Sequence, residues 1–322
     1  MTIEEFFPSM FVYYFRFFMR TFLRRFAYLA LATIACIALQ KFCRSKTDGF
    51  AISKISSNLP YNPDFATRPI SESELQKVEE ILSQPFHYLG KGAQCYAFVS
   101  DDDQYVIKFF RLHNLLTPEW FVNMPLPSFL QSYRKEKIQR KFGEFFRDFL
   151  SYKIAFDSLQ EDTGLIYVHL NKTDVLHKKI TLFDKIKIQH SVDLDSMEFL
   201  LQKKADLFYP ALHKLIQEGK REEVKANVKE LIHFLAKRSS LGLYDKDPDI
   251  NTNFGVCNGK PLQIDVGRFR PDATRTQPDV YISDIIRVTE NLQQWLEAQD
   301  KDLSDSLIEE IQNLKEKNQA CA

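Results

Sequence analysis

Hydrophobic and polar positions divide the chain into parts of different character. Residues 1–46 are dominated by aromatic and apolar side chains, and within them residues 26–39 are apolar or small apart from Thr33. Residues 47–71 are rich in Pro, Ser and Asn, a composition typical of a linker. From residue 72 onward, apolar positions recur at helical or strand spacing. The pattern therefore predicts an N-terminal membrane-associated helix, a linker, and an α+β domain.

The N-terminal helix is expected to have a basic face, because Arg16, Arg20 and Arg24 recur every four residues among aromatic side chains. Helices of this kind lie in the membrane interface. The apolar run 26–39 is shorter than the roughly 20 residues that span a bilayer, but Lys and Arg side chains at its ends can extend toward the headgroups. Spanning and interfacial placements both stay open. A cleaved signal peptide is the alternative, although the charged region before residue 26 is long and no A-x-A site follows.

Residues 72–201 are predicted to form a small lobe of strands and helices. Ser71 and Glu74 form a capping-box signature at the start of a helix. Apolar residues then follow a strand pattern at 86–89, 96–99, 105–110, 165–170 and 197–201. A long helix is predicted over 131–160, and the Pro-rich residues 112–130 before it look like an insertion.

Residues 202–322 are predicted to form a mainly helical lobe around one hairpin. Asn258-Gly259 separates two short apolar runs, a strong hairpin signal. Asp247 and Asn253 precede this hairpin and Asp265 follows it, so three oxygen-bearing side chains are expected at one end of a small sheet. Carboxylate and amide oxygens suit Mg²⁺, which also accepts phosphate oxygens as ligands.

Overall charge and cysteine usage exclude some classes of function. Lys plus Arg and Asp plus Glu number 43 each, so no net field favours nucleic acid as a partner. The five cysteines are odd in number and lack a C-x-x-C spacing. A disulfide framework or a zinc site is therefore disfavoured, and a reducing compartment fits better.

Four motifs together resemble those of the protein-kinase-like fold. Residues 245–247, Asp-Lys-Asp, with Asn253 resemble the His-Arg-Asp catalytic loop and its downstream Asn. Residues 265–267, Asp-Val-Gly, resemble the Asp-Phe-Gly turn. Val-Ile-Lys at 106–108 resembles the third-strand Val-Ala-Ile-Lys, and the Gly-Lys-Gly sequence at 90–92 resembles the glycine-rich loop, with Cys95 in place of its third glycine.

The resemblance implies a role for each of these residues. Gly90, Gly92 and Lys108 would bind the phosphates of ATP, and Glu144 would pair with Lys108. Asp247 would be the catalytic base, and Asn253 and Asp265 would hold Mg²⁺. Asn253 lies six positions after Asp247 where the family has five. Asp245 therefore stays a rival base and Asn251 a rival ligand.

The resemblance also implies a two-lobed α+β fold with an abbreviated large lobe, since no Ala-Pro-Glu follows Arg270 and little more than two helices remain. Enzymes similar in this respect are the bacterial aminoglycoside and lipopolysaccharide-sugar kinases. The expected function is a membrane-anchored, ATP- and Mg²⁺-dependent phosphotransferase whose domain faces the cytosol. Its acceptor would be a hydroxyl group of a small molecule, sugar, lipid headgroup or protein. A catalytically silent kinase-like scaffold at a membrane is the alternative.

Overall fold

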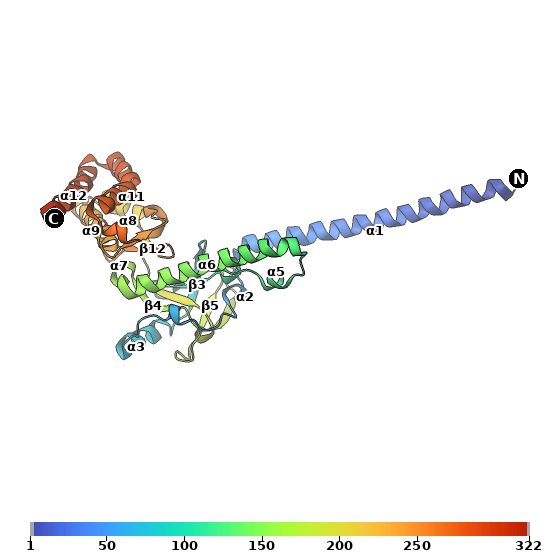
Figure 1. Ribbon diagram of the computed structural model, residues 1–322, viewed down its shortest axis with the longest axis horizontal. Coiled ribbons are helices and arrows are strands. Elements are labelled where there is room, and N and C mark those ends of the chain that lie inside the picture. The colour runs from blue at the N-terminus through green and yellow to red at the C-terminus, as the bar shows by residue number, and fades with distance from the viewer. Residues whose placement is uncertain (1–2, 321–322) are drawn as a thin grey trace. The chain divides into compact units, whose positions relative to one another are not determined.

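The computed structural model describes the backbone of residues 3–320 and the side chains of residues 18–317. Contacts divide the chain into two units, Met1–Phe50 and Ala51–Ala322. The first unit consists of helix α1 (Ile3–Thr47), drawn in blue in Figure 1. Within it, Phe18–Thr47 is long and apolar enough to cross a membrane, a test that signal sequences near an N-terminus also pass.

The second unit contains a seven-stranded sheet with the order β4-β7-β3-β2-β1-β5-β6. Neighbouring strands pair antiparallel except β1 and β5, which are parallel. The strands are β1 (Phe86–Lys91), β2 (Cys95–Ser100), β3 (Tyr105–Phe110), β4 (Leu165–His169), β5 (Lys179–Phe183), β6 (Gln189–Asp193) and β7 (Phe199–Lys203). The hairpin formed by β5 and β6 was not predicted from the sequence.

The second unit also contains helices α3 (Glu72–Ile81) and α6 (Ser128–Ser158), and α6 is the long green helix in Figure 1. The predicted capping box of α3 is confirmed: Ser71 Oγ accepts from the Glu74 amide, and the Glu74 carboxylate accepts from the Ser71 amide. The short helices are α2 (Ile52–Ile55), α4 (Leu112–Leu115), α5 (Glu119–Asn123) and α7 (Gln160–Thr163).

Residues 51–71, most of the linker expected over 47–71, belong to the second unit and pack against the rest of it. Phe65 is buried against the rings of Phe145 and Phe149, and Ile55 is fully buried. Asn62 and Asn171 exchange two hydrogen bonds of 2.9 and 3.0 Å between backbone and side chain. The Pro- and Asn-rich composition of this segment thus corresponds to irregular backbone that is packed against the protein. It does not correspond to a flexible linker.

The C-terminal part is mainly helical, as predicted, and its helices gather around the C-terminus in Figure 1. Its helices are α8 (Phe208–Gln217), α9 (Arg221–Ser240), α10 (Ile250–Asn253), α11 (Pro278–Gln299) and α12 (Lys301–Ala320). Its strands are β8 (Asp206–Leu207), β9 (Leu243–Asp245), β10 (Phe254–Cys257), β11 (Lys260–Gln263) and β12 (Phe269–Pro271).

The Asn-Gly hairpin is present as predicted. Strands β10 and β11 pair antiparallel, with Cys257 opposite Lys260. Asn258 and Gly259 have φ of 52° and 75°, the left-handed values that a two-residue type I′ turn requires. The α+β class is confirmed, and the order of elements, from a strand lobe through β7 into a helical lobe, matches the expected two-lobed arrangement.

Candidate functional site

A cleft of about 570 Å³ lies between the sheet and the segment that follows β7. Strands β1, β2 and β3 contribute Leu89, Gly90, Lys91, Gly92, Ala97, Val106 and Lys108 to its wall. The rest of the wall is formed by the segment from Gln202 to Leu207 and by Ile264. The cleft is therefore lined by the two glycines and the lysine that the sequence analysis singled out.

Lys108 extends from the middle of β3 into this cleft. Its neighbours Ile107 and Phe109 are fully buried, and alternation along a strand directs Lys108 to the opposite face. The ammonium Nζ donates to the Ile264 carbonyl at 2.6 Å. Burial lowers the pKa of this lysine, while the nearby Asp265 carboxylate opposes the shift. Lys108 Nζ is thus held at the residue that precedes the Asp-Val-Gly turn.

Asn253, at the end of α10, connects the catalytic-loop segment to that turn. Its side-chain Nδ2 donates to the Asp247 carbonyl at 2.6 Å, and its own carbonyl accepts from the amides of Ile264 and Asp265 at 2.7 and 3.3 Å. Asn253 is buried, whereas the Asp265 carboxylate is exposed and accepts from the Gly267 amide at 3.3 Å. These hydrogen bonds join the backbone of Asp247 and the backbone of Asp265 through Asn253; a shared metal site for the three side chains stays a prediction. The rival ligand Asn251 is exposed on the outer side of α10.

Asp245 and Asp247 have opposite environments. The Asp245 side chain is buried; one oxygen accepts from the Asp247 amide at 2.9 Å and the other accepts from Gln263 Nε2. Asp247 is exposed, and its two hydrogen bonds use backbone atoms. Of these two carboxylates, that of Asp247 is accessible to solvent, whereas that of Asp245 is used in hydrogen bonds within the protein.

The expected pair between Lys108 and Glu144 is not formed. Glu144 is exposed on α6, and one turn later Asp148 is buried. Asp148 accepts from Arg270 Nη2 and Gln94 Nε2, both at 2.6 Å. Among the residues that the structure describes, no carboxylate of α6 bonds the Lys108 ammonium.

Helix α6 instead contacts the Asp-Val-Gly turn directly. Ser151 Oγ donates to the Val266 carbonyl and accepts from the Phe269 amide, the latter at 2.7 Å. A Cβ added to Gly267 would overlap Gln94 Oε1 and approach Tyr152 Oη to 2.8 Å. Gly267 is therefore needed for the close approach of α6 and the base of the glycine-rich loop to this turn.

The glycine-rich loop is supported by a residue that sequence reasoning missed. Arg111 Nη1 donates to the carbonyls of Gly92 and Ala93 at 2.6 and 3.3 Å, and the Arg111 amide donates to the Gln94 carbonyl at 2.7 Å. Neither Gly90 nor Gly92 has an atom within 4 Å of the position that a Cβ would take. Arg111 thus holds the loop through its backbone carbonyls, and the space next to the α-carbons of the two glycines is open. The sequence offered only a basic residue after a strand, too weak a signal to single out.

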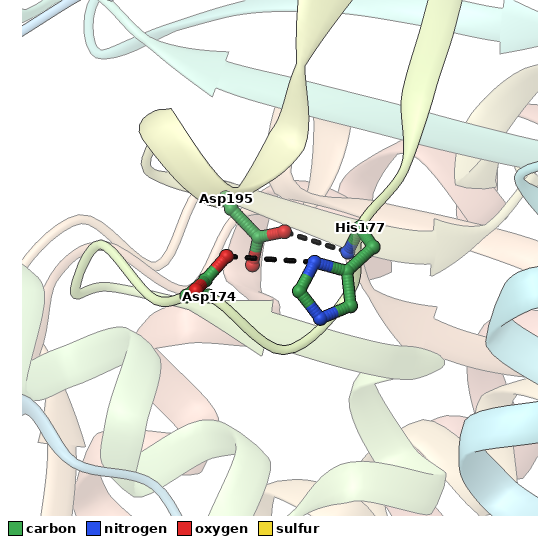
Figure 2. Close-up of side chains that lie close together, drawn as sticks. All are labelled: Asp174, His177 and Asp195. Carbon is green, nitrogen blue, oxygen red and sulfur yellow. Dashed lines mark hydrogen bonds and ion pairs between the residues drawn. The ribbon is translucent and has the colours of Figure 1, made fainter.

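A second cluster of possible metal ligands lies outside the cleft, where Asp174, His177 and Asp195 come within 4.8 Å of one another (Figure 2). The Asp195 oxygens already accept four hydrogen bonds, from Thr173 Oγ1 at 2.6 Å and from the amides of residues 175, 176 and 177 at 2.7–3.1 Å. Burial acts to raise the pKa of Asp195, but these donors together outweigh it and lower the pKa to about 2. Asp195 in this cluster therefore holds the loop before β5 in place through its hydrogen bonds.

Comparisons with known proteins find only distant structural neighbours. No protein-family model and no curated protein matches the chain. A crystal structure of WbdD is 17% identical over 72% of this chain, with a TM-score of 0.36. A second, described as the bifunctional kinase-methyltransferase WbdD, is 18% identical with a TM-score of 0.33. The Rv3197–erythromycin complex from Mycobacterium tuberculosis is 13% identical over 85% of this chain, with a TM-score of 0.33.

This chain spans about half the length of the WbdD chains, 46% and 47%. The TM-scores are low, so the case for a function depends on the residues around the cleft.

Proposed function

We propose that this protein is a membrane-anchored phosphotransferase that uses ATP and Mg²⁺ to phosphorylate a hydroxyl group. One observation carries the proposal: Asn253 bonds Asp247 and the backbone of Asp265 together beside Ile264, whose carbonyl receives Lys108 at the cleft wall. Phosphoryl transfer depends mainly on positioning and charge neutralisation, and this arrangement offers one lysine, two carboxylates and an amide for that work.

The residues present fit both the nucleotide and the metal. A volume of about 570 Å³ lies within the roughly 300–1,000 Å³ typical of small-molecule sites. Asn253 Nδ2 is used by the Asp247 carbonyl, and Asn253 Oδ1 accepts from Thr252 Oγ1 at 3.1 Å. A cation beside the exposed Asp265 carboxylate would use the second lone pair of Oδ1. Bound there, Mg²⁺ would neutralise charge on the phosphates. Lys108 would orient the phosphates, and Asp247 would accept the proton of the acceptor hydroxyl.

Stabilisation by nucleotide tests the binding part of this proposal. The full chain in detergent should melt at a higher temperature with ATP and Mg²⁺, because a ligand that binds only the folded state stabilises it by mass action. Asp265→Asn keeps the shape of the side chain and the acceptor for Gly267, so it should remove the Mg²⁺-dependent part of the increase and leave the protein folded.

Asp305→Asn is the matched control, since it removes the same charge from an exposed position on α12. This variant should respond to ATP and Mg²⁺ like the unmodified chain. A melting temperature that is indifferent to millimolar nucleotide, with or without Mg²⁺, would contradict nucleotide binding.

We place the second unit on the cytosolic side, where ATP is available and thiols stay reduced. Cys36, Cys43, Cys95 and Cys257 are free thiols, in keeping with that compartment. In sealed vesicles whose lumen is the former cytosol, protease added outside should leave residues 51–322 uncut until detergent is added. Digestion in sealed vesicles would instead support the secreted alternative.

A catalytically silent nucleotide-binding scaffold is the second candidate. It is favoured by a specific observation, the lack of a bond between Lys108 and a carboxylate of α6 in the described residues. This candidate predicts binding without turnover, and it differs from the first in the outcome of the Asp247 experiment below.

A further inference from the structure

Helix α5 and the first half of α6 expose an unusual number of large apolar side chains. Trp120, Phe129, Tyr133 and Phe142 are 67%, 78%, 60% and 50% exposed. We call this region the α5–α6 surface; it comprises Trp120, Val122, Phe129, Leu130, Tyr133, Lys135, Lys137, Arg140 and Phe142. Aromatic side chains carry large apolar areas, so a group of them left in water is unfavourable unless a partner covers it.

The two halves of α6 differ in what they contact. All seven buried residues of the helix lie between Phe145 and Phe156. Residues 128–142 have none, although Phe129, Tyr133 and Phe142 lie among them. The first half therefore projects its aromatic side chains without belonging to the core, which makes it a surface for an external partner.

The same half is strongly basic in a chain of zero net charge. Residues 128–142 contain the acidic residue Glu136 and five basic residues, Arg134, Lys135, Lys137, Arg140 and Lys141. The charges lie among the rings: Lys137 Nζ is 5.2 Å from the centre of the Phe121 ring and 6.0 Å from that of Tyr133. Glu119 and Glu144 flank the region at its two ends. A covering partner must accept both aromatic rings and excess positive charge.

The membrane interface has both properties. Trp and Tyr prefer the headgroup region, where an apolar ring and a polar atom are both solvated favourably. Anionic lipids attract nearby Lys and Arg side chains. The chain also carries the apolar segment Phe18–Thr47, so a bilayer is the partner at hand. We propose that the α5–α6 surface lies on a bilayer and binds its anionic headgroups. This inference is independent of the proposed phosphotransfer.

Fluorescence of Trp120 provides a direct test, because the chain has two Trp residues, Trp120 and Trp295. The full chain carrying Trp295→Phe would be reconstituted into vesicles of phosphatidylcholine with brominated acyl chains, with or without roughly 30% phosphatidylserine. Brominated lipid quenches a tryptophan that enters the interface. We expect at least about twofold stronger quenching of Trp120 when phosphatidylserine is present.

Two sets of charge reversals test whether binding depends on the basic residues of the α5–α6 surface or on the net charge of the protein. Lys135→Glu, Lys137→Glu and Arg140→Glu together should abolish the phosphatidylserine-dependent quenching. The same reversals at Lys301, Lys315 and Lys317, exposed on α12, should leave it unchanged. In the Trp120→Phe variant, Trp295 packs against Tyr209 and should not be quenched.

Three outcomes would overturn the proposal. They are equal quenching of the two tryptophans, quenching that is indifferent to phosphatidylserine, and no quenching of Trp120 in either vesicle. The last would indicate that a protein covers the α5–α6 surface. Circular dichroism of each variant distinguishes loss of binding from loss of folding.

Discussion

Replacing Asp247 by Asn should lower the rate of ATP turnover by about 10²- to 10⁴-fold, the usual contribution of a general base. The substitution changes only an exposed carboxylate, because the hydrogen bonds of Asp247 to Asp245 and Asn253 use its backbone amide and carbonyl. Stabilisation by ATP and Mg²⁺ should therefore persist. Release of ADP by the full chain, with water as the acceptor, is the measurement that requires no knowledge of the natural substrate.

Asp249→Asn is the control for this experiment. Asp249 lies two residues further on, is exposed, and caps α10 by accepting from the Asn251 amide and Thr252 Oγ1. Its replacement should leave turnover nearly unchanged. If the unmodified chain binds nucleotide but releases no ADP under any condition, the silent scaffold is the better description. If both Asp variants lose activity equally, Asp247 has no special role.

Replacing Arg238 by Met should lower the free energy of unfolding by about 3–5 kcal/mol, the cost of leaving a buried charge without its partner. Arg238, on α9, is 1% exposed and donates to Gln263 Oε1 at 3.0 Å. Its Nη1 lies 3.9 Å from the buried Asp245 carboxylate. Urea-induced unfolding followed by tryptophan fluorescence would measure the loss.

The pH dependence of this loss gives a sharper criterion. Burial raises the pKa of Asp245, and the Arg238 guanidinium opposes that rise. A carboxyl group whose folded-state pKa is raised loses stabilisation as pH rises through that pKa. Without Arg238 the pKa of Asp245 should rise further. The variant should therefore be closer to the unmodified chain at about pH 4 than at about pH 7.

Arg287→Met is the matched control for stability. Arg287 forms an ion pair of 2.6 Å with Asp284, but its side chain is 60% exposed. Asp284 is itself buried but keeps Arg275 as a second partner at 3.3 Å. An exposed Arg contributes about 0–1 kcal/mol to an ion pair, so this variant should unfold near the same urea concentration as the unmodified chain. If the two variants lost similar amounts of unfolding free energy, the buried Asp245 carboxylate would depend less on the Arg238 guanidinium than its geometry indicates.

Local chemistry accounts for what the sequence could predict. Each correct element has a signal within a few residues: the capping box at Ser71 and Glu74, the Asn258-Gly259 turn, and the lysine between Ile107 and Phe109 in β3. The order of the motifs also predicted which segments lie near one another. Hydrogen bonds through Asn253 join the backbone of Asp247 to that of Asp265, while the roles of their side chains stay a prediction.

What could not be predicted depends on contacts between distant segments. Strand β6 buries only Val192, so its sequence lacks the alternation that reveals a strand with one face in the core. On α6, both Glu144 and Asp148 fit a helical pattern, and only the packing of Phe145, Phe149 and Tyr152 decides that Asp148 faces inward. The packing of residues 51–71 likewise has no local signature.

The unpredicted hairpin changes where the sheet ends. By pairing with Phe86 and His87, strand β5 covers the first two residues of the edge that β1 would otherwise present to solvent. The exposed edge moves to β6, where Gln189, His190, Ser191 and Asp193 are polar. An apolar open edge invites strands of other chains and leads to aggregation, and polar residues discourage it. The hairpin thereby protects the start of the strand that leads into the glycine-rich loop from intermolecular pairing.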